Sequence, residues 1–341
     1  MKAIWIARHG GPNVLEVRTT PDPAAGPGEV RIRVKAVGLN FAEVMARQGL
    51  YPDAPKPPCI VGYEGAGEID ELGSGVTGFS VGDRVLYMKQ FGAHADVVTV
   101  PADQAFRMPA AMDFVTAAAL PVVYLTAYHM LFRIARIRGG EHVLVHMAAG
   151  GVGTAALQLC RTVPGVVTYG TASAKKHDAV REHGCHHPID YRSLDYADEV
   201  RRLTSGRGVD VVLDPLGGAD WKKGYSLLAP AGMLIAFGMA NVNTGGKRRL
   251  FHVLGTVARV PRFSPMKLMN DNRAVAGVNM GHLFGELPML TGEMAELMAL
   301  YEAGKIAPLI SATYPFSRVS EAHADLEYGK NVGKVVLVPD D

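Results

Sequence analysis

A short apolar run that enters a glycine-rich turn is the part of this sequence best suited to chemistry. The run 142–145 leads into the turn 148–153, and an apolar, helix-forming segment follows at 154–160. The turn has the glycine spacing of a dinucleotide-binding loop, with alanine in place of the first glycine. Gly150 would let the backbone approach a pyrophosphate, Gly153 would let strand and helix pack closely, and N–H groups at the helix start would hold the anion. A tight turn without a ligand is the alternative, and the order of strand, turn and helix favours the nucleotide.

The next expected strand, 166–171, bears on which nucleotide would bind. It ends about 20 residues after the turn, where an NAD-binding fold places an acidic residue for the ribose 2′-hydroxyl. The sequence there is 172–176, which contains no carboxylate. Ser173 can donate a hydrogen bond and Lys176 can supply positive charge, so this segment favours NADP(H). The alternative is a solvated lysine pair at the start of the helix expected at 176–183.

The elements that must position these residues fall into three ranges. Residues 1–122 contain short alternating strands separated by turns, which predicts an all-β, barrel-like unit. Residues 123–265 alternate strands with helices, which predicts a doubly wound parallel sheet. Residues 266–341 contain a helical stretch near 290–304 and a closing strand at 333–338, and we expect this tail to return to the first unit. The expected fold class is therefore α/β.

Composition limits the possible functions. With 341 residues, 48% of them hydrophobic, the chain is long enough for two domains. A net charge of +2 gives no general basic field, so nucleic acid is not an expected partner. The three cysteines have no close spacing, and residues 1–6 are typical of a strand rather than a signal peptide, so a cytoplasmic protein is expected. The uncharged stretch 114–132 contains Pro121 and predicts a buried helix pair instead of a membrane span.

Several segments in combination resemble one enzyme family over the whole chain. These segments are 38–43, 62–67, 146–153, 170–173, 187–191, 214–218, 238–241 and 330–334. The chain resembles the zinc-independent medium-chain dehydrogenases/reductases of the quinone oxidoreductase type, most closely their vesicle amine transport protein branch. The resemblance implies a GroES-like catalytic domain and a Rossmann domain, with NADPH in the cleft between them.

The resemblance also implies roles for single residues. Lys176 and Tyr191 match positions around the adenosine 2′-phosphate, and Gly238 and Asn331 match positions that line the nicotinamide end. The other cofactor contacts expected are Thr126, Ala149, Gly150, Gly151, Val152, Gly153 and Ser173. A homodimer is expected.

No zinc site is expected. A zinc alcohol dehydrogenase needs cysteine and histidine ligands, including a Gly-His-Glu turn, and here that turn reads Gly62-Tyr63-Glu64. The position of the first cysteine ligand falls in 39–41, which contains no sulfur, and three cysteines are too few for a four-cysteine lobe. Lewis-acid alcohol oxidation is therefore not the expected chemistry.

Without a metal, the expected reaction is hydride delivery to a carbon made electrophilic by conjugation, as in a quinone, an enone or an enal. Asn40 is the first candidate to hydrogen-bond and orient the acceptor oxygen, with Tyr51 a second polar group nearby. Tyr63 would fill the space of a metal ligand. The alternatives are that Asn40 caps a turn and that Tyr51 packs within a loop. No general acid stands out, so we expect solvent to protonate the product.

A second hypothesis comes from a basic segment. Residues 247–254 and the cations Arg259, Arg262 and Lys267 are interleaved with apolar side chains, including Phe251 and Leu254. Such a segment is able to contact an anionic bilayer, which would suit a lipid-associated protein that binds NADPH with little catalysis. The favoured alternative is a surface helix with solvated cations or a contact between subunits.

Overall fold

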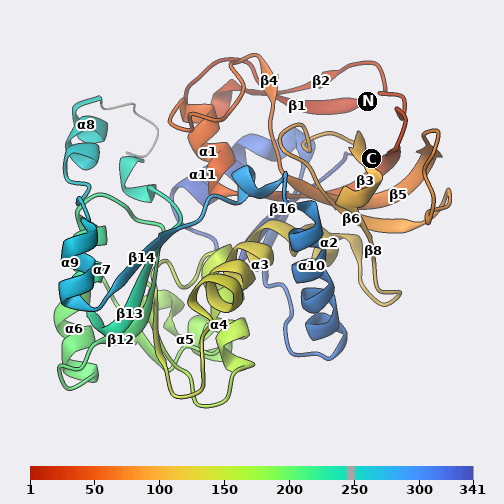
Figure 1. Ribbon diagram of the computed structural model, residues 1–341. Coiled ribbons are helices and arrows are strands. Elements are labelled where there is room, and N and C mark those ends of the chain that lie inside the picture. Colours follow the sequence, from red (N-terminus) through yellow and green to blue (C-terminus); the bar gives the residue numbers. More distant parts are fainter. Residues whose placement is uncertain (244–249, 341) are drawn as a thin grey trace.

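Two sheet systems, one mainly antiparallel and one parallel, organise the protein (Figure 1). The computed structural model describes residues 1–243 and 250–340. The predicted α/β fold, with a barrel-like β unit and a doubly wound parallel sheet, is confirmed.

The antiparallel unit has a seven-stranded sheet and a three-stranded sheet. The larger one has the order β15-β16-β3-β5-β6-β8, with β7 paired to β3. Its strands are β3 (Glu29–Leu39), β5 (Glu64–Leu72), β6 (Arg84–Met88), β7 (Val97–Pro101), β8 (Ala105–Arg107), β15 (Ile310–Pro315) and β16 (Lys334–Val338). The smaller sheet contains β1 (Lys2–Ile6), β2 (Leu15–Thr19) and β4 (Cys59–Ile60). Because β16 pairs antiparallel with β3, the last strand of the chain lies in the same sheet as strands from its first 110 residues.

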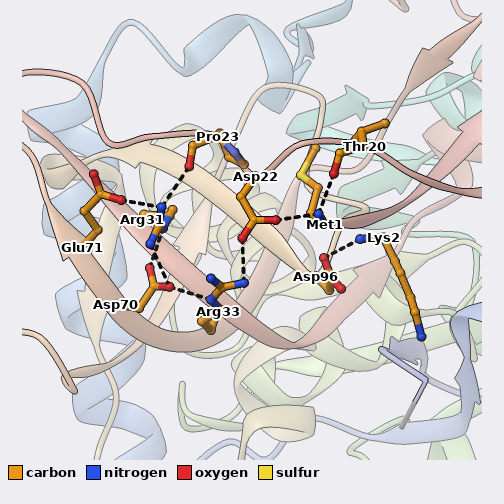
Figure 2. Close-up of polar contacts among 10 residues, drawn as sticks. All are labelled: Met1, Lys2, Thr20, Asp22, Pro23, Arg31, Arg33, Asp70, Glu71 and Asp96. Carbon is orange, nitrogen blue, oxygen red and sulfur yellow. Dashed lines mark hydrogen bonds and ion pairs between the residues drawn. The ribbon is translucent and has the colours of Figure 1, made fainter.

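Outward side chains of β3 and β5 form an ion-pair network on this unit (Figure 2). Arg31 and Arg33, two positions apart on β3, both bind Asp70 on β5, and Asp22 links Arg33 to the amino group of Met1. Partial burial acts to raise the pKa of Asp70, but hydrogen bonds from the two arginines hold it below its ordinary value. The alternation of strand side chains thus puts apolar residues such as Ile32 in the core and a charged network outside.

The parallel sheet has six strands in the order β11-β10-β9-β12-β13-β14, which is the Rossmann order. They are β9 (His142–Val145), β10 (Val167–Thr171), β11 (His187–Ile189), β12 (Val209–Asp214), β13 (Leu228–Ala236) and β14 (Ala274–Gly277). The sheet continues past residue 265, where the sequence analysis ended this domain, because β14 pairs with the free edge of β13. The division into three ranges otherwise stays a prediction.

Helices surround both sheets. They are α1 (Phe41–Gln48), α2 (Phe114–Ala118), α3 (Pro121–Tyr128), α4 (Gly151–Arg161), α5 (His177–Glu182), α6 (Tyr196–Leu203), α7 (Ala219–Ser226), α8 (Leu250–Ala258), α9 (Pro265–Asp271), α10 (Leu287–Glu302) and α11 (Val319–Glu327). A π-helical turn, His129–Ala135, continues α3, and α3 packs against both α4 and α10. The stretch 114–132 therefore forms the buried helix pair expected, and within the described ranges no helix has the length and hydropathy needed to span a membrane.

Candidate functional site

One cleft, with a volume of about 1720 Å³, lies between the two units and is lined by both. Every residue proposed above for catalysis or cofactor binding lines it. They are Asn40, Tyr51, Tyr63, Thr126, Ala149, Gly150, Gly151, Val152, Gly153, Ser173, Lys176, Tyr191, Gly238 and Asn331. The volume exceeds the roughly 300–1,000 Å³ typical of a pocket for one drug-sized ligand, so the cleft has room for a cofactor and a second molecule.

The glycine turn forms the floor of this cleft between β9 and α4. A Cβ atom on Gly153 would lie 2.4 Å from the carbonyl oxygen of Met147, so only glycine permits this contact between the helix start and the end of the strand. Gly150 is the N-cap of α4, and the first N–H groups of the helix have no partner within it. Gly333 donates to the carbonyl of Ala149 (2.8 Å), which fixes the turn to the antiparallel unit. These residues fit the pyrophosphate of a dinucleotide.

The segment after β10 forms one end of the cleft. Ser173 is buried, whereas Tyr191 is half exposed. The ammonium of Lys176 donates to the backbone carbonyls of Gly329 (2.8 Å) and Asn331 (2.5 Å), which leaves one of its three hydrogens for a ligand. Burial, aided by neighbouring cations, lowers the pKa of Lys176. This end therefore presents a hydroxyl and a cation, as a 2′-phosphate requires.

Sequence reasoning missed Arg192 at this end. Its guanidinium lies 5.9 Å from the ring centre of Tyr191, and the side chain lines the cleft. The available signal was its position directly after Tyr191. A second cation beside Lys176 strengthens the preference of this end for an anionic group.

Two further predicted cofactor contacts already have partners. The hydroxyl of Thr126 donates to the carbonyl of Val122 one turn earlier in α3 (2.6 Å). The amide of Asn331 donates to the carbonyl of Gly333 (2.8 Å) and is buried. Toward a ligand, Thr126 therefore retains only its oxygen lone pairs, and its role stays a prediction.

A buried polar cluster lies where Asn40 and Glu64 meet β16. Lys334, 3% exposed, pairs with the fully buried carboxylate of Glu64 (2.5 Å) and donates to the amide oxygen of Asn40 (2.5 Å). The other oxygen of Glu64 accepts from the backbone N–H of Val122, in the first turn of α3 (2.7 Å). The lysine and the positive end of the helix together neutralise this carboxylate.

Glu43, on α1, is the second carboxyl of the cluster and is also fully buried. Burial raises its pKa to about 8, although the positive charge of Lys334 opposes this. The nearest histidine, His94, lies 3.8 Å away, and burial lowers its pKa to about 4. At neutral pH the cluster therefore holds one ion pair, a protonated carboxyl and a neutral imidazole.

Asn40 is an integral part of this cluster. It is the N-cap of α1, as the alternative in the sequence analysis had it, and its backbone N–H donates to Glu43 (2.9 Å). Its amide nitrogen donates to Glu64 (2.9 Å) and to Glu43 (3.3 Å), and its oxygen accepts from Lys334. Both amide hydrogens thus have acceptors within the protein, so a substrate oxygen would have to displace one of them.

Tyr63 and Tyr51 are two further polar residues that line the cleft. The hydroxyl of Tyr63 is buried and makes no well-formed hydrogen bond to the described residues, although the Tyr51 hydroxyl lies close enough to act as its acceptor and to influence its pKa. Burial, with the charge of Glu43, raises the pKa of Tyr63 far above its ordinary value. The hydroxyl of Tyr51 reaches Asn279 of the other unit only at 3.5 Å. The Tyr63 hydroxyl is thus a protonated donor in the cleft wall, with the Tyr51 hydroxyl beside it.

Comparisons with known proteins agree with this architecture. A family model described as an alcohol dehydrogenase GroES-like domain matches residues 26–110, and one described as a zinc-binding dehydrogenase matches residues 183–337. The human protein named synaptic vesicle membrane protein VAT-1 homolog is 47% identical over 341 residues, covering 99% of this chain and 86% of the relative. A quinone oxidoreductase of Pseudomonas aeruginosa is 36% identical, covering 99% of both chains.

Solved structures show similarity to the same two groups of proteins, the VAT-1 homologues and the quinone oxidoreductases. The crystal structure of the human synaptic vesicle membrane protein VAT-1 homolog-like protein has a TM-score of 0.87 and 37% identity, covering 100% of this chain and 98% of the other. The Escherichia coli quinone oxidoreductase, solved in complex with NADPH, has a TM-score of 0.87 and 30% identity, covering 99% and 100%. This chain belongs to the medium-chain dehydrogenase/reductase family, as a quinone oxidoreductase-type member close to the VAT-1 branch.

The name of one matched family model implies zinc, but the cleft does not fit a zinc ion. Asn40 and Tyr63 offer no thiolate or imidazole, and Glu64 is already paired with Lys334. Across 1–243 and 250–340, no three His, Cys, Asp or Glu side chains are grouped so that they could hold a metal ion. The ammonium of Lys334 would also repel a second cation at Glu64.

Proposed function

We propose that this protein catalyses the NADPH-dependent reduction of a conjugated carbonyl compound, such as a quinone, an enone or an enal, without a metal ion. The observation that carries the proposal is one continuous cleft that joins the glycine turn to a wall containing the protonated hydroxyl of Tyr63, which makes no well-formed hydrogen bond to the described residues. The NADPH complex of the Escherichia coli relative supports the cofactor assignment. The named quinone oxidoreductase relatives support the substrate class.

The residues of the cleft would divide the work as follows. The N–H groups at the start of α4 hold the pyrophosphate, and Ser173, Lys176 and Tyr191 hold the 2′-phosphate. When bound, NADPH supplies the hydride for the electrophilic carbon. Gly238 and Asn331 line the nicotinamide end of the cleft in this proposal.

The acceptor oxygen becomes negatively charged as the carbon is reduced, and a fixed donor lowers the barrier. We assign this donor role to Tyr63, because its hydroxyl makes no well-formed hydrogen bond to the residues that the structure describes, and we propose Asn40 as a positioning residue that holds Lys334 and Glu64. Since the raised pKa of Tyr63 keeps its proton in place, solvent protonates the product.

The test is NADPH consumption against a panel of quinones, enones and enals, followed by variants. Tyr63→Phe should lower kcat roughly ten- to a thousand-fold while the Kd for NADPH is unchanged. Tyr328→Phe, on an exposed tyrosine outside the cleft, is the matched control. A loss of kcat in Asn40→Ala that exceeds the loss in Tyr63→Phe would return the donor role to Asn40.

A second candidate function rests on the surface of α8 and α9. Phe251, Met266 and Met269 are 89%, 70% and 67% exposed, and Arg259 and Arg262 are exposed near them. The basic residues 247–249 of the sequence-based hypothesis lie outside the described residues. Apolar side chains beside cations suit an anionic bilayer surface, and relatives are named as synaptic vesicle membrane proteins. Liposome co-sedimentation that salt abolishes, without NADPH consumption for any acceptor, would favour this function. Cytoplasmic location and a homodimer stay predictions.

A further inference from the structure

Helix α8 lies at the edge of the molecule and is attached to the parallel-sheet unit by one face (Figure 1). The imidazole of His252 makes a hydrogen bond to the carbonyl of Asn241 (2.7 Å), and one turn later Thr256 is buried. A Cβ atom on Gly218 would lie 2.9 Å from the methyl group of Thr256, so the helix sits close against that turn. These contacts fix which way the other faces of α8 point.

The next face around the helix lines the cleft. Val253 and Val257 follow His252 and Thr256 by one residue each and are therefore displaced by about 100° around the axis. A further rotation in the same direction reaches Leu254 and Phe251, which are 55% and 89% exposed. One apolar surface thus runs from inside the cleft, over Val257, to the outside of the molecule.

Apolar side chains from elsewhere line the same cleft. Phe41 and Met45 come from α1, and Leu283 and Phe284 come from the 3-10 turn η6 (Met280–Leu283) and the residue after it. Tyr51 reaches Asn279, at the start of that turn, so this tyrosine and the apolar residues of η6 are neighbours. These four side chains extend the apolar lining of the cleft beyond α8.

We infer that the substrate carries a hydrocarbon tail, which lies in the cleft against Val253 and Val257 and leaves it past Leu254. This inference rests on the proposed function, because the carbonyl end of the same molecule would be held at Tyr63. Val257 lines the cleft and is 52% exposed, so apolar area remains there that a hydrocarbon chain would remove from water. A neutral hydrocarbon chain matches this lining. A negatively charged group attached to the substrate would meet no counter-charge at Val253 or Val257.

The experiment compares a homologous series of 1-alken-3-ones from five to eleven carbons, with kcat/KM measured by NADPH consumption. Each methylene buried against the cleft wall should raise kcat/KM about two- to fourfold until the tail passes Leu254. If the protein reduces these ketones but kcat/KM does not depend on chain length, the tail site is wrong while the proposed function stands.

Variants locate the tail. Val253→Asn and Val257→Asn should each lower kcat/KM for the longest ketone at least tenfold more than for the shortest. Met269→Asn, at an apolar position on α9 that is 67% exposed and lies outside the cleft, is the control and should keep the wild-type dependence. If Phe251→Asn and Leu254→Asn flatten the dependence while Val253→Asn and Val257→Asn do not, the tail binds outside the cleft and the inference is wrong.

A binding measurement separates this inference from the reaction. Saturated 2-alkanones of four to ten carbons are titrated calorimetrically into the wild-type protein and into Val257→Asn. Affinity that rises with chain length in the wild type and not in the variant supports the tail site even if no alkenone is reduced. Affinity independent of chain length in both proteins overturns it.

Discussion

Replacing Glu43 by glutamine should remove a pH-dependent loss of stability that the buried carboxyl imposes. Below pH 4.5 this carboxyl is protonated in the folded and in the unfolded chain, so it does not affect the free energy of unfolding. Between pH 4.5 and about 8 the unfolded chain releases the proton while the folded protein keeps it, because burial raises the folded pKa to about 8. The free energy of unfolding therefore falls by about 1.4 kcal/mol per pH unit in this window. Above pH 8 both states are ionised and the loss is complete.

Over the whole window from pH 4.5 to about 8, the loss of unfolding free energy has an upper bound of roughly 5 kcal/mol. We expect side-chain relaxation around Lys334 and entry of water to reduce this loss to about 2–3 kcal/mol. Glutamine keeps the acceptor for the backbone N–H of Asn40 and cannot ionise. Thermal melting is measured at pH 5.5, 7.0 and 8.5. The midpoint of Glu43→Gln relative to wild type should rise by about 5–10 °C between the lowest and the highest pH.

Glu68→Gln is the control, since Glu68 is 45% exposed on β5 and its pairing with Lys35 is long, at 3.7 Å. The difference in melting midpoint between Glu68→Gln and wild type should not change with pH by more than about 1 °C. A difference between Glu43→Gln and wild type that is constant from pH 5.5 to 8.5 would show that Glu43 ionises with an ordinary pKa. The assignment of a protonated carboxyl to the cluster would then be wrong.

Three further predictions concern the cofactor and the metal. Lys176→Ala should weaken NADPH binding at least tenfold, about 1.4 kcal/mol, and leave NADH binding nearly unchanged, because only the 2′-phosphate loses a partner; fluorescence titration of both nucleotides checks this. Gly153→Ala should abolish NADPH binding or lower the melting midpoint, because the added Cβ meets the carbonyl of Met147 at 2.4 Å, whereas Gly255→Ala, with no atom within 4 Å of its Cβ, should do neither. Elemental analysis should find no stoichiometric zinc, and chelators should leave activity intact; one zinc per chain would contradict the repulsion expected from Lys334.

The fold and the cofactor end of the cleft were predictable because their signals are local. The glycine spacing after β9 and the missing carboxylate after β10 lie within 30 residues of each other, and the change from alternating strands to alternating strands and helices marks the second unit. The strand β14 was missed because it contains only four small residues, Ala274–Gly277, and owes its pairing to the free edge of β13. Its sequence alone does not separate it from a loop.

The buried cluster was not predictable, since its members are far apart in the chain and of types usually found on surfaces. Lys334 lies 294 positions from Asn40 and 270 from Glu64, and no spacing rule connects them. Lysine and glutamate are seldom fully buried unless paired, so each one alone indicates a solvated side chain. Only the antiparallel pairing of β16 with β3 brings the lysine to the carboxylate.

This cluster supports the proposal that the donor role falls to a tyrosine. Glu64 pairs with Lys334 and accepts from the start of α3, so the positive charge of Lys334 already has a partner inside the protein. An ammonium in a matched pair polarises a substrate oxygen weakly, because its field is cancelled by the nearby carboxylate. In this proposal the stronger local donor is the neutral hydroxyl of Tyr63 in the cleft wall, and the substrate oxygen displaces the neighbouring Tyr51 hydroxyl as its acceptor. A neutral donor gains most when charge develops on the acceptor, which is the condition for lowering the barrier of the proposed reduction.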